Sequence, residues 1–326
     1  MAPERKKYFE PKLTLAEDSD FHTTISLTVK RLLQSCLTGQ CFENLDSTTI
    51  PSQDSVEKII QLTRRIIFPG YFTQSVLAPN NLEYCLHQEV TDLIKLLSKQ
   101  ICLSIQHNVK HSELSSLQCN EIGRKRALEF IHSLPKLRSL LSTDVQAGFK
   151  GDPAAKSHDE VIFSYPGLFA ILVYRMAHEL YRLEVPLLPR MMTEYAHSHT
   201  GIDIHPGARI AESFFIDHGT GVVIGETTEI GSRVRIYQGV TLGALSIPSD
   251  KIEQYRYKKR HPAIEDDVII YSNTTILGCE TVIGTRSIIG GNVWITASVP
   301  PDTKVILKRP ELIFAGNGQK AGTFQP

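Results

Sequence analysis

The chain has 326 residues, and its 35 basic and 35 acidic side chains give a formal net charge of +0. This length suffices for two ordinary domains, and the even charge disfavours nucleic acid as a partner, since nucleic-acid-binding domains are usually strongly basic. No apolar run approaches the roughly 20 residues that span a bilayer. Met1 to Pro11 is charged where a signal peptide would be apolar. Scattered cysteines without a CxxC pair predict no disulfide framework, and we expect a cytoplasmic protein.

Residues 1–200 are predicted to be helical. Apolar residues at helical spacing predict helices over residues 26–37, 56–67, 82–105 and 119–141. Phe68-Pro69-Gly70 is expected to end the second of these. Tyr165-Pro166-Gly167 then opens an apolar segment that runs to Leu183, and a last helix is expected to end near His199. We interpret the apolar stripes as helix–helix packing, which predicts an all-α first domain.

From about residue 204 onward, aliphatic residues recur at every sixth position. The first block contains Ile204, Ile210, Ile216, Val222, Val234 and Val240, with Thr228 as the weak step, beside Ile224, Ile230, Ile236 and Leu242. The second contains Ile264, Ile270, Ile276, Val282, Ile288 and Trp294, beside Leu277, Ile283, Ile289 and Ile295. A period of six is typical of a parallel β-helix, in which three short strands complete a triangular coil of roughly 18 residues.

The predicted fold class is therefore α+β. An N-terminal all-α helical domain over residues 1–200 is followed by a left-handed parallel β-helix of hexapeptide repeats over residues 201–310, and by a flexible tail over residues 311–326. Residues 244–259 break the repeat, are polar and contain Pro248. We expect them to form a loop extruded from one corner of the prism, where irregular chain can form the wall of a site.

Five strings of residues carry a more specific signal. They are TDVQAGFKGDPA from Thr143, DIHPGARI from Asp203, IDHGTGVVIGET from Ile216, QGVTLGA from Gln238 and RHPAIEDDVII from Arg260. Together they resemble the bacterial-type serine O-acetyltransferases, hexapeptide-repeat acyltransferases that make O-acetylserine for cysteine synthesis. The resemblance covers about residues 143–300. It implies transfer of an acetyl group from acetyl-CoA, as co-substrate, to the hydroxyl of L-serine, with no permanently bound cofactor and no metal.

His218 and Asp203 are the candidate catalytic pair. A serine hydroxyl is a poor nucleophile at neutral pH, so a base must remove its proton, and histidine is the usual choice. A carboxylate on the other ring nitrogen would fix the tautomer. The two residues are 15 positions apart, about one coil, so their side chains could lie on neighbouring rungs. A lone histidine on a strand is more often structural, but the matching family positions are the base and its partner.

The candidate substrate-binding residues carry both signs of charge, as a zwitterion requires. By the resemblance, Asp152 and Asp217 hold the amine and hydroxyl end of serine, whereas Arg260 and His261 hold its carboxylate. The planar fork of arginine suits a carboxylate because it can make two parallel bonds. From the residues alone, Asp152 is better explained as a turn aspartate before proline, and Arg260 could be a solvated loop charge.

The coenzyme contacts are where the sequence departs from the family. Gly243, Ala244 and Ser272 match positions that border the acetyl-CoA cleft, but the family commonly has glycine at position 244 and often alanine at position 272. The loop over residues 244–259 is also longer than in the best-known enterobacterial members. Lys258 and Lys259 are candidates for contacts with the coenzyme phosphates.

Three alternatives remain open at this point. His205, His218 and His261 could form a zinc site of the γ-class carbonic anhydrase kind, although that family's close H-x4-H pair is missing from the repeats. The chain could instead acylate another acceptor such as a sugar, or be a silent β-helical scaffold, which would have no need for the charged set described above.

The resemblance also implies partners. Hexapeptide acyltransferases form homotrimers with active sites between neighbouring prisms, so that His218 and Arg260/His261 would come from different subunits. Pairing of two trimers through the helical domain would give a dimer of trimers. L-cysteine is the expected feedback inhibitor. The family often inserts a C-terminal isoleucine into O-acetylserine sulfhydrylase, whereas this chain ends in Pro326, which argues against that complex.

Overall fold

The computed structural model describes residues 15–37, 49–73, 76–108 and 114–308, so the predicted tail over residues 311–326 lies outside the described residues. The chain separates into two compact units, residues 1–48 and residues 49–326. The first unit contains helix α1 (Leu15–Cys36), which begins well before the predicted start at residue 26. The second unit holds all the other described elements.

The helices of the second unit precede all of its strands. They are α2 (Gln53–Ile67), α3 (Leu82–Asn108), α4 (Ser116–Gly151), α5 (His158–Ser164), α6 (Pro166–Arg182) and α7 (Leu188–Thr200). This confirms the helical first part of the predicted fold, although α4 continues well beyond its predicted end and α5 was not predicted. Among the described helices, none is long and apolar enough by itself to cross a membrane; only α5 and α6 taken together pass, and they are bent by 73°.

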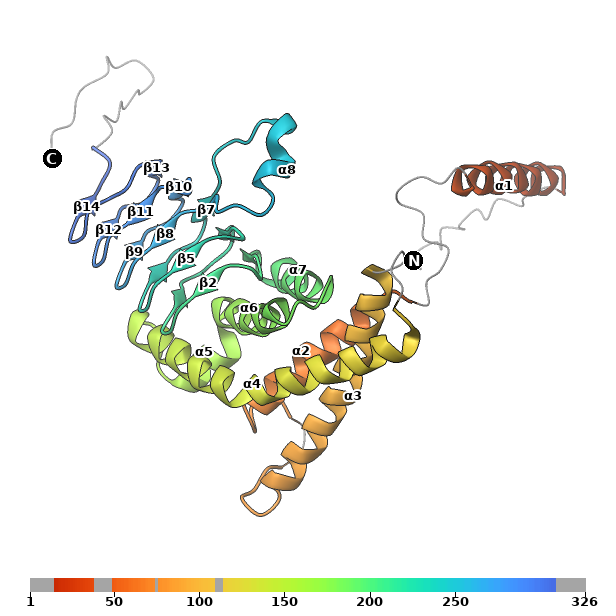
Figure 1. Cartoon of the computed structure of the whole chain (residues 1–326), viewed down its shortest axis with the longest axis horizontal. Coiled ribbons are helices and arrows are strands. Elements are labelled where there is room, and N and C mark those ends of the chain that lie inside the picture. Colours follow the sequence, from red (N-terminus) through yellow and green to blue (C-terminus); the bar gives the residue numbers. More distant parts are fainter. Residues whose placement is uncertain (1–14, 38–48, 74–75, 109–113, 309–326) are drawn as a thin grey trace, which may run out of the picture. The chain divides into compact units, whose positions relative to one another are not determined.

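The strands that follow form three parallel sheets, one for each side of a left-handed β-helix (Figure 1). Sheet A contains β1 (Asp203–Ile204), β4 (Val223–Ile224), β7 (Thr241–Gly243), β10 (Thr275–Leu277) and β13 (Trp294–Ile295). Sheet B contains β2 (Arg209–Ile210), β5 (Glu229–Ile230), β8 (Ala263–Ile264) and β11 (Val282–Ile283). Sheet C contains β3 (Phe215–Ile216), β6 (Arg235–Ile236), β9 (Ile269–Ile270), β12 (Ile288–Ile289) and β14 (Lys304–Val305).

The six-residue series fills the interior of the prism. Every member of the first block is buried, including Thr228, as are Ile264, Ile270 and Ile276. The inward position then shifts by one residue, so that Ile283, Ile289 and Ile295 are buried whereas Trp294 is 69% exposed. The shift arises in the coil that contains β10, where Ala263 pairs with Val282 and not with Thr281, which a regular repeat would place opposite it.

Two further coils depart from the regular repeat, and both extensions matter for the site. The pairing of Val223 with Thr241 shows the regular spacing. Asp203 pairs with Val223 and not with Gly221, because the corner between sheets C and A is longer here, over residues 217–222, than in the next coil, over residues 237–240. We call residues 217–222 the extended corner. Glu229 pairs with the distant Ala263, because the predicted loop over residues 244–259 is extruded between them.

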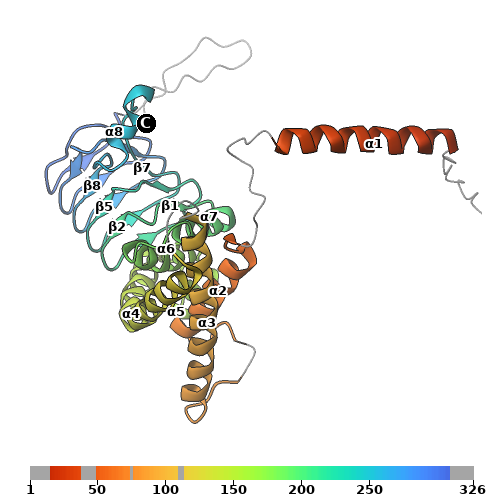
Figure 2. The same cartoon turned by 45° about the vertical axis from the view of Figure 1, so that its right-hand side comes forward.

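The extruded loop carries the only helical turns that the structure describes after β1. They are η2 (Ser249–Lys251) and α8 (Ile252–Tyr255), and α8 stands away from the coils in both views (Figure 2).

The helices close the N-terminal end of the prism. Backbone carbonyls of the first coil have no preceding coil to pair with, and side chains of α6 bond them instead. The Tyr174 hydroxyl donates to Ala208 O at 2.6 Å, and His178 Nδ1 donates to Pro206 O at 2.8 Å. Arg175 donates to Ile210 O at 3.2 Å and to Ala211 O at 2.8 Å. The helical part and the first coil are therefore one continuous hydrogen-bonded structure.

Candidate active site

The predicted substrate-binding residues and His218 fall into two groups at different corners of the prism. The aspartate–histidine cluster lies at the corner between sheets C and A and consists of Asp152, Tyr165, Asp217, His218 and Arg235. The arginine–histidine cluster lies at the corner between sheets A and B and consists of His205, Glu226, Thr227, Arg260 and His261. Since both groups flank sheet A, the width of that sheet separates them within one chain.

The string TDVQAGFKGDPA is the strip by which α4 docks on β3. At its start, the Thr143 hydroxyl accepts the Ser213 N–H at 2.9 Å, and the Asp144 carboxylate accepts the Phe214 N–H at 3.0 Å. At its end lies Gly151, where a Cβ atom would come within 2.8 Å of the Phe215 ring. The strip therefore needs these polar residues and glycine to bring α4 against β3. Asp152 is the C-cap of α4 and follows Gly151 directly, so the packing of Gly151 on Phe215 places Asp152 beside β3.

Asp152 is held by two hydrogen bonds. Its Oδ2 accepts the Tyr165 hydroxyl at 2.5 Å, and its Oδ1 accepts the Ala154 N–H at 2.8 Å. The bond from Tyr165 is the main reason why the pKa of Asp152 lies below its ordinary value, since donors stabilise the charged carboxylate. Asp152 is thus an ionised, oriented acceptor at the edge of the cluster.

Asp217 and His218 begin the extended corner, directly after β3. Asp217 is only 8% exposed, and burial raises the pKa of its carboxyl, with Asp152 adding to the rise and His218 opposing it. Its Oδ1 lies 3.8 Å from His218 Nε2, and the His218 side chain is 72% exposed. His218 has a φ of +58°, but several other corner residues such as Ser213 and Arg233 have a similar positive φ, so the left-handed backbone alone is no sign of function.

Two members of this cluster were not predicted from the sequence. Arg235 donates to Gly151 O and lies over the Phe215 ring, 5.5 Å from its centroid. Tyr165 was noted only as part of a helix-starting Tyr-Pro-Gly turn. Arg235 contacts Gly151 and Tyr165 contacts Asp152, and the members of the first pair are far apart in sequence. The one signal in the sequence was that Phe215 and Arg235 each precede a predicted inward isoleucine, at positions 216 and 236.

The arginine–histidine cluster is built around Glu226. Arg260 donates to its carboxylate, and the Tyr181 hydroxyl donates to it at 3.1 Å. Although burial acts in the opposite direction, these bonds and the charge of His205 keep the pKa of Glu226 below its ordinary value. Arg260 is thus ordered by an ion pair and is not the freely solvated loop charge that the sequence left open.

The protonation of His261 is fixed by Thr227. The Thr227 N–H donates to His261 Nδ1 at 3.1 Å, and the Thr227 hydroxyl lies 2.8 Å from the same nitrogen. An Nδ1 that accepts a hydrogen bond carries no proton, so in the neutral ring the proton is on Nε2. Burial, assisted by the charge of Arg260, lowers the pKa of His261 to about 4. His261 is therefore a neutral hydrogen-bond donor through Nε2 at physiological pH.

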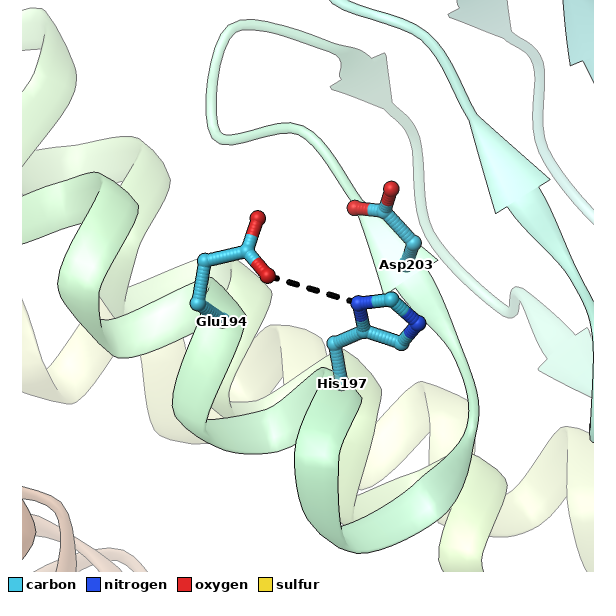
Figure 3. A group of neighbouring side chains, drawn as sticks. All are labelled: Glu194, His197 and Asp203. Carbon is cyan, nitrogen blue, oxygen red and sulfur yellow. Dashed lines mark hydrogen bonds and ion pairs between the residues drawn. The ribbon is translucent and has the colours of Figure 1, made fainter.

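Asp203 lies on β1, opposite helix α7. Its Oδ1 is 3.7 Å from Arg190 Nη1, and Arg190 also pairs with Glu194 at 2.5 Å. Glu194, His197 and Asp203 form a group of potential metal ligands among the described residues (Figure 3), but Arg190 already pairs with both of its carboxylates. No hydrogen bond or ion pair joins Asp203 to His218, both of which are described, so their pairing stays a prediction.

The predicted coenzyme contacts lie at both corners of sheet A. Gly243 ends β7, and Ala244 begins the extruded loop at the same corner as Arg260 and His261. Ser272 lies in the corner between sheets C and A, two coils beyond His218. Lys259 Nζ donates to Glu229 at 3.0 Å and to Thr227 O at 3.2 Å, so this predicted phosphate contact is engaged with the prism.

Comparison with known proteins identifies the family. No family model matches the chain. A plasmid-encoded serine acetyltransferase of Synechococcus elongatus is 47% identical to it over 255 residues, which cover 77% of this chain and 80% of that relative. The chain belongs to the serine acetyltransferase family. The serine acetyltransferase of Bacillus subtilis is 43% identical over 181 residues, covering 56% of this chain and 79% of the relative.

Solved serine acetyltransferase structures agree with this assignment. Serine acetyltransferase 1 of Entamoeba histolytica, in complex with L-cysteine, superposes with a TM-score of 0.67 at 36% identity, covering 77% of this chain and 86% of that one. The enzyme of Neisseria gonorrhoeae, in complex with serine, has a TM-score of 0.50 at 26% identity, covering 79% and 97%. The chain is thus a hexapeptide-repeat acyltransferase whose family reaction is the O-acetylation of serine.

Proposed function

We propose that the chain transfers the acetyl group of acetyl-CoA to the hydroxyl of L-serine, with His218 as the general base. The single observation that carries this assignment is the extended corner, which presents an exposed imidazole 3.8 Å from Asp217 beside the ionised Asp152. His218 would take the hydroxyl proton as the serine oxygen attacks the thioester carbonyl. When the carbon–sulfur bond breaks, the imidazolium would return that proton to the departing thiolate.

His218 and His261 have different proposed roles. His261 cannot accept a proton at Nδ1, which already receives the Thr227 N–H, and its Nε2 carries hydrogen. It is therefore a donor and not a base. His218 is exposed, and among the described residues no N–H or hydroxyl group donates a hydrogen bond to either of its ring nitrogens. This difference supports His218 as the base and His261 as a contact for the negative end of the substrate.

The charges of the two clusters suit the two ends of serine. Asp152 and Asp217 would receive the ammonium group, and Arg260 and His261 the carboxylate. Asp203 would support the His218 imidazolium, which requires its carboxylate to turn from Arg190, 3.7 Å away, towards the extended corner. Acetyl-CoA would lie along sheet A near Gly243, Ala244 and Ser272, between the two clusters.

A second subunit is needed for one serine molecule to contact both clusters. The aspartate–histidine and arginine–histidine clusters flank sheet A at different corners, so one serine molecule would contact the first cluster of one protomer and the second cluster of its neighbour. A homotrimer of β-helical domains, residues 201–310, supplies that arrangement. Residues 1–200 would complete the serine site through Asp152 and allow the pairing of two trimers.

L-cysteine is the proposed inhibitor. It shares the ammonium and carboxylate groups of serine, and the Entamoeba histolytica relative has been solved with it bound. Competition at the serine site would raise the apparent KM for serine without unfolding the protein.

The test is the release of free coenzyme A thiol from acetyl-CoA, with and without L-serine. Serine-dependent release by the wild type, reduced at least a hundredfold in His218→Ala, is expected, because general-base catalysis contributes roughly 10²–10⁴ in rate. Release that His218→Ala retains would assign the base to another residue. If thiol release is independent of serine but increases when a sugar is added, the acceptor is the sugar and not serine.

A further inference from the structure

Tyr165 is fixed in place by its two neighbours in the chain. Pro166 occupies the first turn of α6, where its ring restricts the backbone. Gly167 packs so closely on the end of β3 that a Cβ atom would lie 2.3 Å from Ile216 O. The Tyr165 ring is stacked with Phe215, with 6.4 Å between centroids and 29° between planes. The side chain is therefore held directly beside the residues that precede His218.

The Tyr165 hydroxyl bonds one carboxylate of the aspartate–histidine cluster and lies within the electrostatic influence of the other. It donates to Asp152 Oδ2 at 2.5 Å. Burial, the bond to Asp152 and the nearby charge of Asp217 all raise the pKa of the Tyr165 phenol, so it remains a donor at every physiological pH. The described charged and titratable groups that face Asp152 and this phenol are Glu160 of α5, Asp217 and His218 after β3, and Arg235 of β6.

Two carboxylates in one site repel each other, and the site attracts a cation fully only when both are charged. Asp217 already has a raised pKa because it is buried, and the charge of Asp152 raises it further. Without a donor, Asp152 would be subject to the same repulsion. The Tyr165 bond counteracts it and also fixes the direction in which the remaining lone pairs of Asp152 point.

We infer that Tyr165 is a positioning residue for the acceptor amino acid, whose hydroxyl orients Asp152 and keeps it charged for the substrate ammonium group. This inference rests on the proposed serine site. Because Tyr165 acts through Asp152, its effect is confined to ligands that carry an ammonium group, such as L-serine and L-cysteine, and leaves the binding of acetyl-CoA unchanged.

The variant Tyr165→Phe removes the hydroxyl and keeps the ring stacked on Phe215. In the variant, serine binding must itself orient the Asp152 carboxylate, which the Tyr165 hydroxyl does beforehand in the wild type, so we expect the KM for serine to rise roughly tenfold, which corresponds to about 1.4 kcal/mol. The inhibition constant for L-cysteine should rise by the same factor, whereas kcat and the KM for acetyl-CoA stay within about twofold. The acid limb of kcat/KM for serine should move to higher pH, because Asp152 loses the donor that lowers its pKa.

The matched control is Tyr71→Phe. It removes a hydroxyl that donates to another aspartate, Asp159, at 2.6 Å, in the helical part and outside the candidate site. We expect no change in the KM for serine or in the pH profile. In a double-mutant cycle, Tyr165→Phe should have no further effect on serine once Asp152→Asn is present, because the two residues act as one unit.

The outcomes separate this inference from the proposed function. A wild-type enzyme without serine-dependent thiol release overturns both. An active wild type with an unchanged serine KM and acid limb in Tyr165→Phe overturns the inference alone. An equal loss for serine and acetyl-CoA, or a full effect of Tyr165→Phe on top of Asp152→Asn, makes Tyr165 a structural residue and also overturns it.

Discussion

The ion pair of Asp144 and Arg175 joins the helices to the β-helix, and its loss should be costly. Their side chains are 0% and 2% exposed. Asp144 accepts Arg175 Nε at 2.6 Å and Nη2 at 2.8 Å, as well as the Phe214 N–H. Burial raises the pKa of Asp144, and the two bonds from Arg175 oppose that rise. The Asp144 carboxylate therefore depends on Arg175 for its charged form.

The variant Asp144→Ala leaves the Arg175 guanidinium buried without a carboxylate. Breaking a buried pair by removing one partner costs about 3–5 kcal/mol. The orphaned Phe214 N–H contributes in the same direction, whereas the carbonyls of Ile210 and Ala211 continue to accept from Arg175. We therefore expect a loss of about 4 kcal/mol, a large share of the roughly 5–15 kcal/mol that stabilises a typical domain.

The measurement is urea unfolding followed by far-ultraviolet circular dichroism at one fixed protomer concentration, since assembly shifts apparent stability. Glu194→Ala is the control, because it breaks a 2.5 Å pair with Arg190 whose side chains are 45% and 47% exposed. Such surface pairs contribute less than about 1 kcal/mol. If Asp144→Ala costs no more than Glu194→Ala, the view that this pair joins the two parts of the fold is refuted.

Two further predictions concern the arginine–histidine cluster. Gly225→Ala would place a Cβ atom 2.1 Å from His261 Cδ2, so the imidazole ring must move. We expect the KM for serine to rise at least fivefold and the KM for acetyl-CoA to change less. Unchanged serine kinetics would show that His261 does not contact serine. His218→Ala and Arg260→Ala should each be inactive alone, but refolding them together should restore roughly a quarter of the sites if each site takes its two clusters from different subunits of a symmetric oligomer. A mixture that remains inactive would put both clusters of a site on one chain.

The repeat could be predicted from the sequence because burial inside a narrow prism leaves a periodic trace. The helical first part followed by a β-helix is confirmed, and so is the extruded loop. The one-residue shift at β10 escaped prediction because both phases of the second block are aliphatic, and only packing selects Ile289 over Ile288. Helix α5 was missed because seven residues are too short for a helical period to stand out.

The site was predicted less completely. The motif strings pointed to Asp152, Asp217 and His218, and the structure brings these three together. Tyr165 and Arg235 could not be predicted, because their roles depend on how closely α4 and α6 approach β3. The pairing of His218 with Asp203 rested on the length of one regular coil. That coil is lengthened by the extended corner, and Asp203 contacts Arg190.

The helices that cover the N-terminal end of the prism make its two ends differ in how well they tolerate added or removed coils. At the N-terminal end, Tyr174, Arg175 and His178 bond particular carbonyls of the first coil, so a coil inserted or deleted there would separate every one of these donors from its acceptor. Coils further along pair with similar neighbours through backbone bonds, as in other solenoids, and side-chain pairs such as Arg233 with Asp267 add to them. In evolution or in design, the prism can therefore be lengthened or shortened beyond the coil that contains Ser272, whereas its beginning is constrained by the helices.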